Sequence, residues 1–251
     1  MKFFQFILLS GCLYLSAMEV DLKLYENSFY SPNGEDGIFA RLFTLLKPQL
    51  YFCVDCGAND GISSNLTFLL RSQGWKGLLF DRAYDIPTAN LHKESLTTEN
   101  INTLFTQYAV PEVFDLLTID TGYNDFYLWN ALDKRYTPSV VCIAYNAYLG
   151  PSDDKVVIYH PYYCGDDTTY FGASILALAR LGKAKGYTLV YAEETGRHLF
   201  FILDALIKDH QLLFKDANVV SKLFHMPHYE IGYRFDSRNR EYISSNEAIK
   251  K

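Results

Sequence analysis

Residues 52–61 read FCVDCGANDG, and this stretch decides the fold. Its first half is apolar, and a D-x-G-x-x-x-G pattern runs from Asp55 to Gly61. A short apolar run predicts a buried strand, and glycines directly after a strand allow positive φ and a close approach of the backbone to a ligand. Ser63 or Ser64 then stands in a position to cap a helix. We therefore expect a strand, a ligand-binding turn and a helix, in that order.

Apolar runs alternate with helical patterns outward from this stretch. The predicted strands cover residues 50–55, 77–81, 114–120 and 139–145, and a hairpin pair covers 188–192 and 198–203. The predicted helices cover residues 35–47, 63–73, 98–108, 125–132 and 174–185, with one more near Val219. This alternation predicts a doubly wound α/β fold: a mainly parallel sheet with one antiparallel strand near its C-terminal end and helices on both faces. Ligands of such sheets bind at the C-terminal ends of the strands.

The composition restricts the class of protein and of ligand. The 251 residues are 49% hydrophobic and 21% charged, which excludes a disordered chain, a collagen and a coiled coil. The formal net charge of −6 disfavours nucleic acid and anionic lipid as partners. Neutral or cationic small molecules, or sugars, are the ligands that this composition favours.

The N-terminus resembles a secretory leader. Lys2 precedes an apolar stretch over residues 3–17 that is too short to span a bilayer comfortably. Two processing sites compete, because Leu9-Ser10-Gly11-Cys12 resembles a bacterial lipobox with a lipid anchor at Cys12, whereas Leu15-Ser16-Ala17 resembles an ordinary signal-peptidase site. We expect an exported or envelope-associated protein with a leader at residues 1–17. The alternative is a cytoplasmic protein with an apolar first helix or a start at Met18.

Cys53 and Cys56 form a C-x-x-C pair within the first predicted strand. Positions three apart on a strand point to opposite faces, so this pair is poorly placed to share a metal or a disulfide. Core cysteines are the interpretation that the spacing favours.

The charges around the glycine turn bear on the identity of a cofactor. A dinucleotide requires G-x-G-x-x-G, but the middle glycine is missing here, and Asp55 and Asp60 would crowd its phosphates. Like charges at about 4 Å repel by roughly 1 to 4 kcal/mol. S-adenosylmethionine is cationic and carries no phosphate, and Asp81, 20 residues after Gly61, is placed to accept hydrogen bonds from its ribose. The alternative is that Asp55 caps a turn and Asp81 faces water.

Six stretches in order resemble FkbM-type methyltransferase-like proteins. They are residues 30–38 (YSPNGEDGI), 54–61 (VDCGANDG), 74–77 (GWKG), 98–102 (TENIN), 114–120 (FDLLTID) and 170–174 (YFGAS). The resemblance covers roughly residues 28–205 and implies a Rossmann-like class I methyltransferase domain that uses S-adenosylmethionine. The attributed chemistry of the family is O-methylation of a hydroxyl, often on sugars or polyketides. Residues 206–251 would be a C-terminal extension packed on this domain, with a frayed end.

The chain departs from the family pattern at two strand ends. The pattern has a second acidic residue two positions after Asp120 and then Gly-Asn-Asp, whereas this chain has Gly122 and then Tyr123. The next strand of the family ends Glu-Tyr-Asn, and here it ends with Ala144 in the place of the glutamate. The two missing carboxylates would face the cleft, so their absence changes the acceptor, removes a metal or base, or marks a decayed active site.

The resemblance and the strand ends together give the candidate site. Asp120 is the first choice for a base, with a pKa raised by partial burial, or else it caps the following helix. Asn124 and Asp125 would orient the acceptor or support Asp120. The cofactor-binding candidates are Asn33, Glu35, Asp55, Gly57, Asn59, Asp60, Gly61 and Asp81. By resemblance Asn33, Glu35 and Asp36 lie over the cofactor cleft; otherwise Asn33 forms a turn and the two acids begin a helix.

The remaining candidates carry weaker signals. His160, Asp166 and Asp167 lie in an aromatic loop where acceptor-binding residues could be found, and Pro227 interrupts the pair His225 and His228, so no metal is expected. The leading hypothesis is an S-adenosylmethionine-dependent O-methyltransferase acting on a small molecule or glycan. The alternative is a catalytically degenerate, exported binding or scaffold protein on the same fold, and an NAD-linked oxidoreductase is disfavoured by the loop acids.

Overall fold

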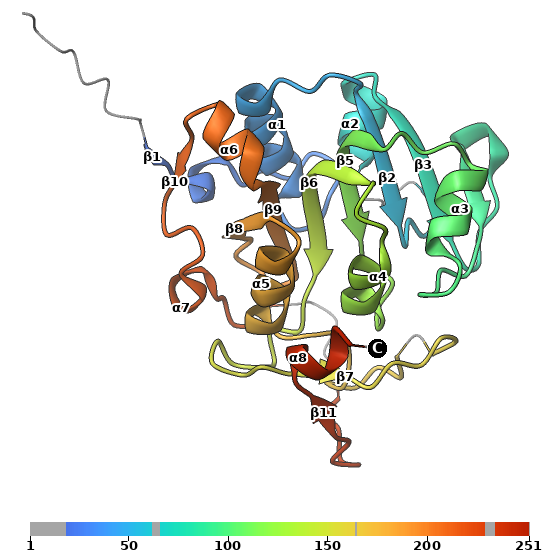
Figure 1. Cartoon of the computed structure of the whole chain (residues 1–251), viewed down its shortest axis with the longest axis vertical. Coiled ribbons are helices and arrows are strands. Elements are labelled where there is room, and N and C mark those ends of the chain that lie inside the picture. The colour runs from blue at the N-terminus through green and yellow to red at the C-terminus, as the bar shows by residue number, and fades with distance from the viewer. Residues whose placement is uncertain (1–18, 62–65, 164, 229–233, 251) are drawn as a thin grey trace, which may run out of the picture.

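The computed structural model describes residues 19–61, 66–163, 165–228 and 234–250, and its centre is one seven-stranded sheet (Figure 1). The strand order is β4-β3-β2-β5-β6-β9-β8. The bounds are β2 Phe52–Cys56, β3 Lys76–Asp81, β4 Leu91–Lys93, β5 Val113–Ile119, β6 Thr137–Ala144, β8 Tyr187–Ala192 and β9 His198–Leu203. All neighbouring strands are parallel except β9, which runs antiparallel to both β6 and β8. The predicted fold class, with one reversed strand near the C-terminal end, is confirmed.

Helices cover both faces of the sheet, as expected. One layer contains α1, α2 and α6, and the other contains α3, α4 and α5. The bounds are α1 Glu35–Leu46, α2 Thr67–Ser72, α3 Ile101–Gln107, α4 Asp125–Ala131, α5 Ile175–Ala184 and α6 Asp204–Asp209. Apolar residues of these helices pack against the sheet, with those of α6 only partly buried, and the sheet itself divides the core into two large clusters.

The first strand shows how residue alternation divides between the two layers. Val54 and Cys56 pack into the cluster of α3, α4 and α5, while Cys53 packs into the cluster of α1 and α2. Cys53, Cys56 and Cys142 are buried free thiols, and burial raises the pKa of each well above its ordinary value. The prediction that the C-x-x-C pair consists of core cysteines is confirmed. Cys12 and Cys164 lie outside the described residues.

The C-terminal extension forms more regular structure than its sequence indicates. Its elements are β10 Leu213–Phe214, α7 Val220–Leu223, β11 Tyr242–Ile243 and α8 Ser245–Ala248. β10 pairs with β1 (Glu19–Val20), and β11 pairs with β7 (Val156–Val157). Ser244 and Glu247 form a capping box at the start of α8, and Ala248 is fully buried. The expected frayed end is wrong for residues 236–250, because a short capped helix docks the chain against α5.

Some sequence predictions differ from the structure or fall outside it. β4 was missed because it has three residues, two of them His92 and Lys93, on an edge of the sheet. The proposed caps Ser63 and Ser64 and the whole leader lie outside the described residues. No described helix has both the length and the apolar character needed to cross a bilayer.

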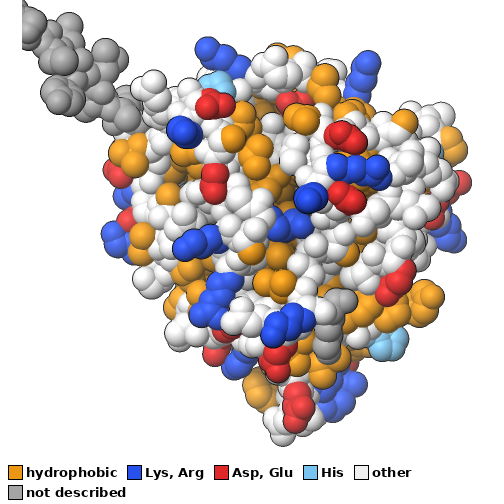
Figure 2. Space-filling view, viewed as in Figure 1, with side chains coloured by type: hydrophobic (Ala, Val, Ile, Leu, Met, Phe, Trp, Pro, Cys, Tyr) orange, Lys and Arg blue, Asp and Glu red, His pale blue; other side chains and the backbone are white. Residues whose placement is uncertain are grey.

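Figure 2 shows one face of the molecule. On it, Lys and Arg side chains alternate with Asp and Glu side chains, with hydrophobic side chains between them. Both signs of charge are present on this face, and no large acidic patch is seen on it.

Candidate active site

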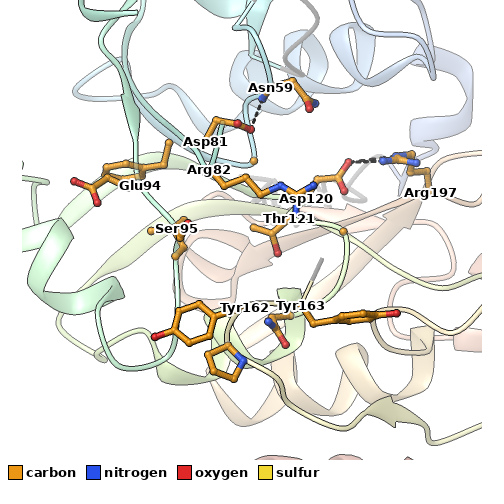
Figure 3. Close-up of a pocket in the computed structure, with 16 residues that line it drawn as sticks. Asn59, Asp81, Arg82, Glu94, Ser95, Asp120, Thr121, Tyr162, Tyr163 and Arg197 are labelled. Carbon is orange, nitrogen blue, oxygen red and sulfur yellow. Dashed lines mark hydrogen bonds and ion pairs between the residues drawn. The ribbon is translucent and has the colours of Figure 1, made fainter. Parts of the chain in front are cut away.

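A cavity of about 350 Å³ opens at the carboxyl ends of β2, β3 and β5 (Figure 3). The chain runs from β2 outward through β3 and β4 and then returns to the other side of β2 as β5, so the strand order reverses at this place. Such a switch point is where ligands of open α/β sheets bind. The wall is formed by Gly57, Asn59, Phe80, Asp81, Arg82, Glu94, Ser95, Leu96, Asp120, Thr121, Gly122, Asn124, Pro161, Tyr162, Tyr163 and Arg197.

Gly57 is required by the close approach of two strand ends. Its φ is +106°, and a Cβ at this position would lie 2.1 Å from the backbone oxygen of Asp120. The backbone N–H groups of Gly57 and Ala58 both donate to the carbonyl of Phe80, at 2.9 and 3.0 Å. The turn is therefore held against both neighbouring strands, and its glycine leaves the backbone bare where the cavity begins.

Asp81 lies at the wall of the cavity and is only 8% exposed, so the alternative that it faces water is wrong. One carboxylate oxygen accepts a hydrogen bond from the N–H of Asn59 at 3.0 Å, and the other accepts from the N–H of Ala83 at 2.7 Å. A carboxylate has about four acceptor sites, so these contacts orient Asp81 and leave capacity for a ligand hydroxyl.

Three of the predicted cofactor-binding residues, all from β2 and the turn after it, lie away from the cavity wall. Asp55 is 4% exposed and accepts a hydrogen bond at 2.5 Å from the Thr118 hydroxyl on the neighbouring strand. Asp60 and Gly61 belong to the same turn but do not line the cavity. The acidic groups that do face it are Asp81, Glu94 and Asp120, so they would act on a ligand in place of Asp55 and Asp60.

Asp120 is paired with two cationic groups. Its Oδ2 accepts hydrogen bonds from Nη2 and Nε of Arg197, at 2.9 and 3.2 Å, and lies 3.3 Å from Nε2 of His198. Burial favours a raised pKa, but the charges of Arg197 and His198 outweigh it and hold the pKa of Asp120 well below its ordinary value. The expected rise toward neutrality is wrong, because the sequence did not indicate either partner.

Glu35 reaches the same group from the first turn of α1. It is fully buried, and its Oε1 lies 2.8 Å from Nδ1 of His198. The side chain and the backbone N–H of Asn33 both donate to it, at 2.9 and 3.1 Å. Burial opposes ionisation, but the contact with His198 lowers the pKa of Glu35 to about 2. Asn33 and Glu35 do not line the cavity, so they act on it through His198.

Asp36 has a structural role. It begins α1 beside Glu35, and one of its oxygens accepts three backbone N–H groups, from Phe29, Tyr30 and Ser31, at 2.6 to 2.9 Å. A carboxylate that accepts several N–H groups fixes a loop conformation. Asp36 thus shapes the segment before α1 and is not part of the cavity wall.

Asp125 and Asn124 begin α4 immediately below the cavity. Oδ1 of Asp125 accepts hydrogen bonds from the N–H and the hydroxyl of Thr121, at 2.6 and 2.9 Å. Burial and the nearby charge of Asp120 raise the pKa of Asp125 to about 7. Asn124 lines the cavity and donates to the carbonyl of His160 at 2.8 Å. The helix N-cap is Asn124, so the alternative in which Asp120 caps this helix is wrong.

The two departures from the family pattern meet at one place. Gly122 and Ala144 both line a small second cavity of about 20 Å³, together with Asp120, Asp125 and Arg197. A space of this size accommodates one water molecule.

The aromatic loop supplies one wall, although not through the predicted residues. Pro161, Tyr162 and Tyr163 line the cavity, while His160, Asp166 and Asp167 do not. Arg240 of the C-terminal extension donates to the Tyr163 hydroxyl at 3.1 Å. The extension therefore holds a part of the cavity wall in place.

Replacing Arg240 by alanine is expected to lower the free energy of unfolding by about 2 kcal/mol and to loosen the loop, since hydrogen bonds to charged groups contribute about 1.5 to 3 kcal/mol each. The same guanidinium also donates to Thr168 at 2.7 Å and stacks 4.1 Å over the Tyr170 ring. Urea unfolding and limited proteolysis between residues 158 and 170 measure both effects. Arg180→Ala is the control, because Arg180 is exposed and pairs with Asp154, which lies outside this loop. Equal loop cleavage in the two variants would contradict the role of Arg240.

Metal binding has no support within the described ranges. No group of three His, Cys, Asp or Glu residues among them could hold an ion. His225 is partly buried, which lowers its pKa, and His228 is exposed.

Sequence reasoning missed Arg82, Arg197 and His198. Figure 3 shows the Arg82 side chain extending along the cavity toward Asp120 from the opposite side to Arg197. Arg197 and His198 could have been identified from the sequence. A reversed strand begins at the edge of the sheet where the parallel strands end, so His198, the first residue of β9, and Arg197 before it lie beside the site.

Comparisons with known proteins do not identify a family for this chain. No family model matches the chain, and no curated protein matches it. Among solved structures it is similar to an O-methyltransferase family protein from Burkholderia thailandensis, with 11% sequence identity and a TM-score of 0.36. The match covers 67% of this chain and 57% of that chain, so this chain spans little more than half of that protein's length.

Proposed function

We propose that this chain binds S-adenosylmethionine in the cavity beside Asp81 and transfers its methyl group to a hydroxyl of a small molecule or glycan. The observation that carries the proposal is the hollow of about 350 Å³ at the strand-order switch point, with a buried and pre-oriented carboxylate at its wall. That volume is at the lower end of the range for small-molecule sites. The FkbM-type motifs in residues 28–205 add support from the sequence.

The charges of the wall favour a cationic donor. Asp81 would accept hydrogen bonds from the ribose hydroxyls, and the bare backbone at Gly57 would let the ligand approach the turn. The charge of Asp120 is already paired with that of Arg197. Among the other lining side chains, the two carboxylates of Asp81 and Glu94 outnumber the one cation, Arg82. A pyrophosphate would meet those two carboxylates, whereas a sulfonium would be attracted by them.

Methyl transfer to oxygen breaks the bond from sulfur to the methyl carbon and forms a bond from that carbon to the acceptor oxygen, whose proton goes to a base. Alignment and exclusion of water supply most of the acceleration of such a displacement. Asp120 would orient the acceptor hydroxyl by accepting its hydrogen bond. Asp125, whose pKa is about 7, has the proton affinity that suits a base at neutral pH.

Isothermal titration calorimetry with S-adenosylmethionine tests the proposal. The wild type is expected to bind, and Asp81→Asn is expected to bind at least about tenfold more weakly, because a lost charged hydrogen bond of about 1.4 kcal/mol changes an equilibrium constant tenfold. Asparagine keeps one acceptor for the turn. Asp85→Asn is the matched control, since Asp85 is an exposed acid four residues away. Absence of binding to the wild type at millimolar ligand rejects the proposal.

A second candidate function is a non-catalytic binding or scaffold protein on this fold. It is favoured by the pairing of Asp120 with Arg197 and by the absence of carboxylates at Gly122 and Ala144. The leader, if it directs export, also favours it, because the donor is made in the cytosol. Methyl transfer to any hydroxylated acceptor that Asp120→Asn abolishes rules this candidate out. Ligand binding without turnover across a panel of sugars and alcohols supports it.

A further inference from the structure

We infer that His198 is a positioning residue of the cavity: a buried imidazolium that keeps the Asp120 carboxylate ionised and fixed, so that Asp120 meets the ligand as a hydrogen-bond acceptor and not as its base. Only the identity of that ligand rests on the proposed function. The role of His198 itself is carried by contacts within the chain.

The contacts form an unbroken line from the first helix to the cavity. Glu35 Oε1 lies 2.8 Å from Nδ1 of His198, and Nε2 of the same ring lies 3.3 Å from Oδ2 of Asp120. Glu35 is fully buried, His198 is 2% exposed, and the side chain of Asp120 is 19% exposed where it lines the cavity. This chain of contacts therefore runs from the buried Glu35 to Asp120 at the wall of the cavity.

The hydrogen-bond partners of the His198 ring determine its charge. Ionised carboxylates only accept hydrogen bonds, and each nitrogen of His198 faces one. A neutral imidazole carries a single N–H and would leave one carboxylate facing a lone pair. Both contacts are satisfied only when both nitrogens carry hydrogen, which is the imidazolium. Consistent with this, burial favours a lowered pKa of His198, but the two carboxylates outweigh it and raise the pKa to about 10.

The other charged groups around the ring agree with this assignment. Arg197 precedes His198 and binds the same oxygen of Asp120. Glu193 accepts the backbone N–H groups of Arg197 and His198 and so holds the start of β9. Asp125 beside Asp120, Asp55 on β2 and the Cys142 thiol on β6 are further titratable groups of this region, and the charges of Glu35, Asp120 and Asp55 contribute to the raised pKa of Cys142. The two cations, His198 and Arg197, balance Glu35 and Asp120.

This balance has a chemical consequence for the cavity. A carboxylate that two cations stabilise binds a proton weakly, so Asp120 is a poor base at neutral pH. The same two contacts take up Oδ2 and hold the plane of the group, which leaves Oδ1 to present to a hydroxyl or a cationic ligand. His198 thus sets both the charge and the direction of the acceptor.

Histidine and aspartate side-chain NMR of the full chain test the inference without any ligand. We expect the two ring nitrogens of His198 to carry the imidazolium signature from pH 5 to pH 8.5. In Glu35→Gln, which keeps the shape of the pair, the ring should titrate at least one pH unit lower. In His198→Gln, the Asp120 carboxyl should titrate at higher pH than in the wild type, while His228→Gln, at an exposed histidine, should leave it unchanged.

Calorimetry with S-adenosylmethionine adds the link to the ligand. We expect His198→Gln, with its fold verified by circular dichroism, to bind at least fivefold more weakly than the wild type, and His228→Gln to bind equally. A neutral His198 ring at pH 7, an unchanged Asp120 titration in His198→Gln, or equal affinity of His198→Gln and wild type overturns the inference. If the wild type does not bind the donor, the proposed function fails, and the NMR titrations alone decide the role of His198.

Discussion

Gly57→Ala is expected to destabilise the protein by about 3 kcal/mol or more and to abolish ligand binding. Two costs combine, because a non-glycine residue in a sparsely populated backbone region costs roughly 1 to 3 kcal/mol and overpacking costs a similar amount. The clash is with the backbone oxygen of Asp120, 2.1 Å from the new Cβ, and that backbone is tied to the sheet by the hydrogen bond from Asp120 N to Cys56 O at 2.9 Å. Neither partner can move without breaking the sheet at the cavity.

Gly74→Ala provides the matched control for this result. Gly74 also has a positive φ, +69°, but a Cβ there meets nothing within 4 Å. The control therefore isolates the backbone cost, about 1 kcal/mol, from the cost of the close approach. Urea unfolding of both variants measures the difference. Equal losses in the two would mean that the contact between the β2 turn and Asp120 is not rigid.

Asp125→Asn is expected to stabilise the protein at pH 8 by about 4 kcal/mol and to be neutral near pH 3, since one pKa unit corresponds to about 1.4 kcal/mol. The pKa of Asp125 is raised in the folded protein from 3.8 to about 7, so the folded state holds this proton more tightly than the unfolded state does. The stability that this proton confers is complete below pH 3.8 and is lost as the pH rises through about 7. Asparagine can still accept both hydrogen bonds from Thr121, but it cannot ionise.

Urea unfolding of Asp125→Asn and wild type between pH 3 and pH 8 measures this effect. Asp85→Asn, which removes an exposed acid, is again measured beside it as the control. A difference between Asp125→Asn and wild type that stays constant from pH 3 to pH 8 would refute the raised pKa. It would also remove Asp125 as the residue that accepts the proton of the acceptor hydroxyl.

Sequence patterns were enough for the architecture because strands and helices depend on local periodicity. The run 114–120 is mostly apolar and forms β5, and the run 139–145 forms most of β6. Gly57 and Asp81 were identified for the same reason, since a turn after a strand needs particular residue types within a few positions. The edge strand β4 was missed because three residues are too few to show a period.

Which residues form the site depends on contacts between residues far apart in the sequence, and no local pattern predicts such contacts. Asp55 and Asp81 each end or nearly end a strand, but the pleat directs Asp55 toward Thr118 and Asp81 toward the cavity. The burial of β2 could be predicted from its apolar residues. The contact of Asp55 could not, because the Thr118 hydroxyl that it accepts from belongs to β5.

The sequence by itself determined the doubly wound sheet, the glycine turn and the location of a cavity at the strand ends, because each follows from residue spacing along the chain. Only the tertiary structure decided the charge state of that site. Glu35 and His198 are 163 positions apart, and Asp120 and Arg197 are 77 apart. A pKa is set by desolvation and by the charges within a few ångströms, and the reversal of β9 is what brings those charges together.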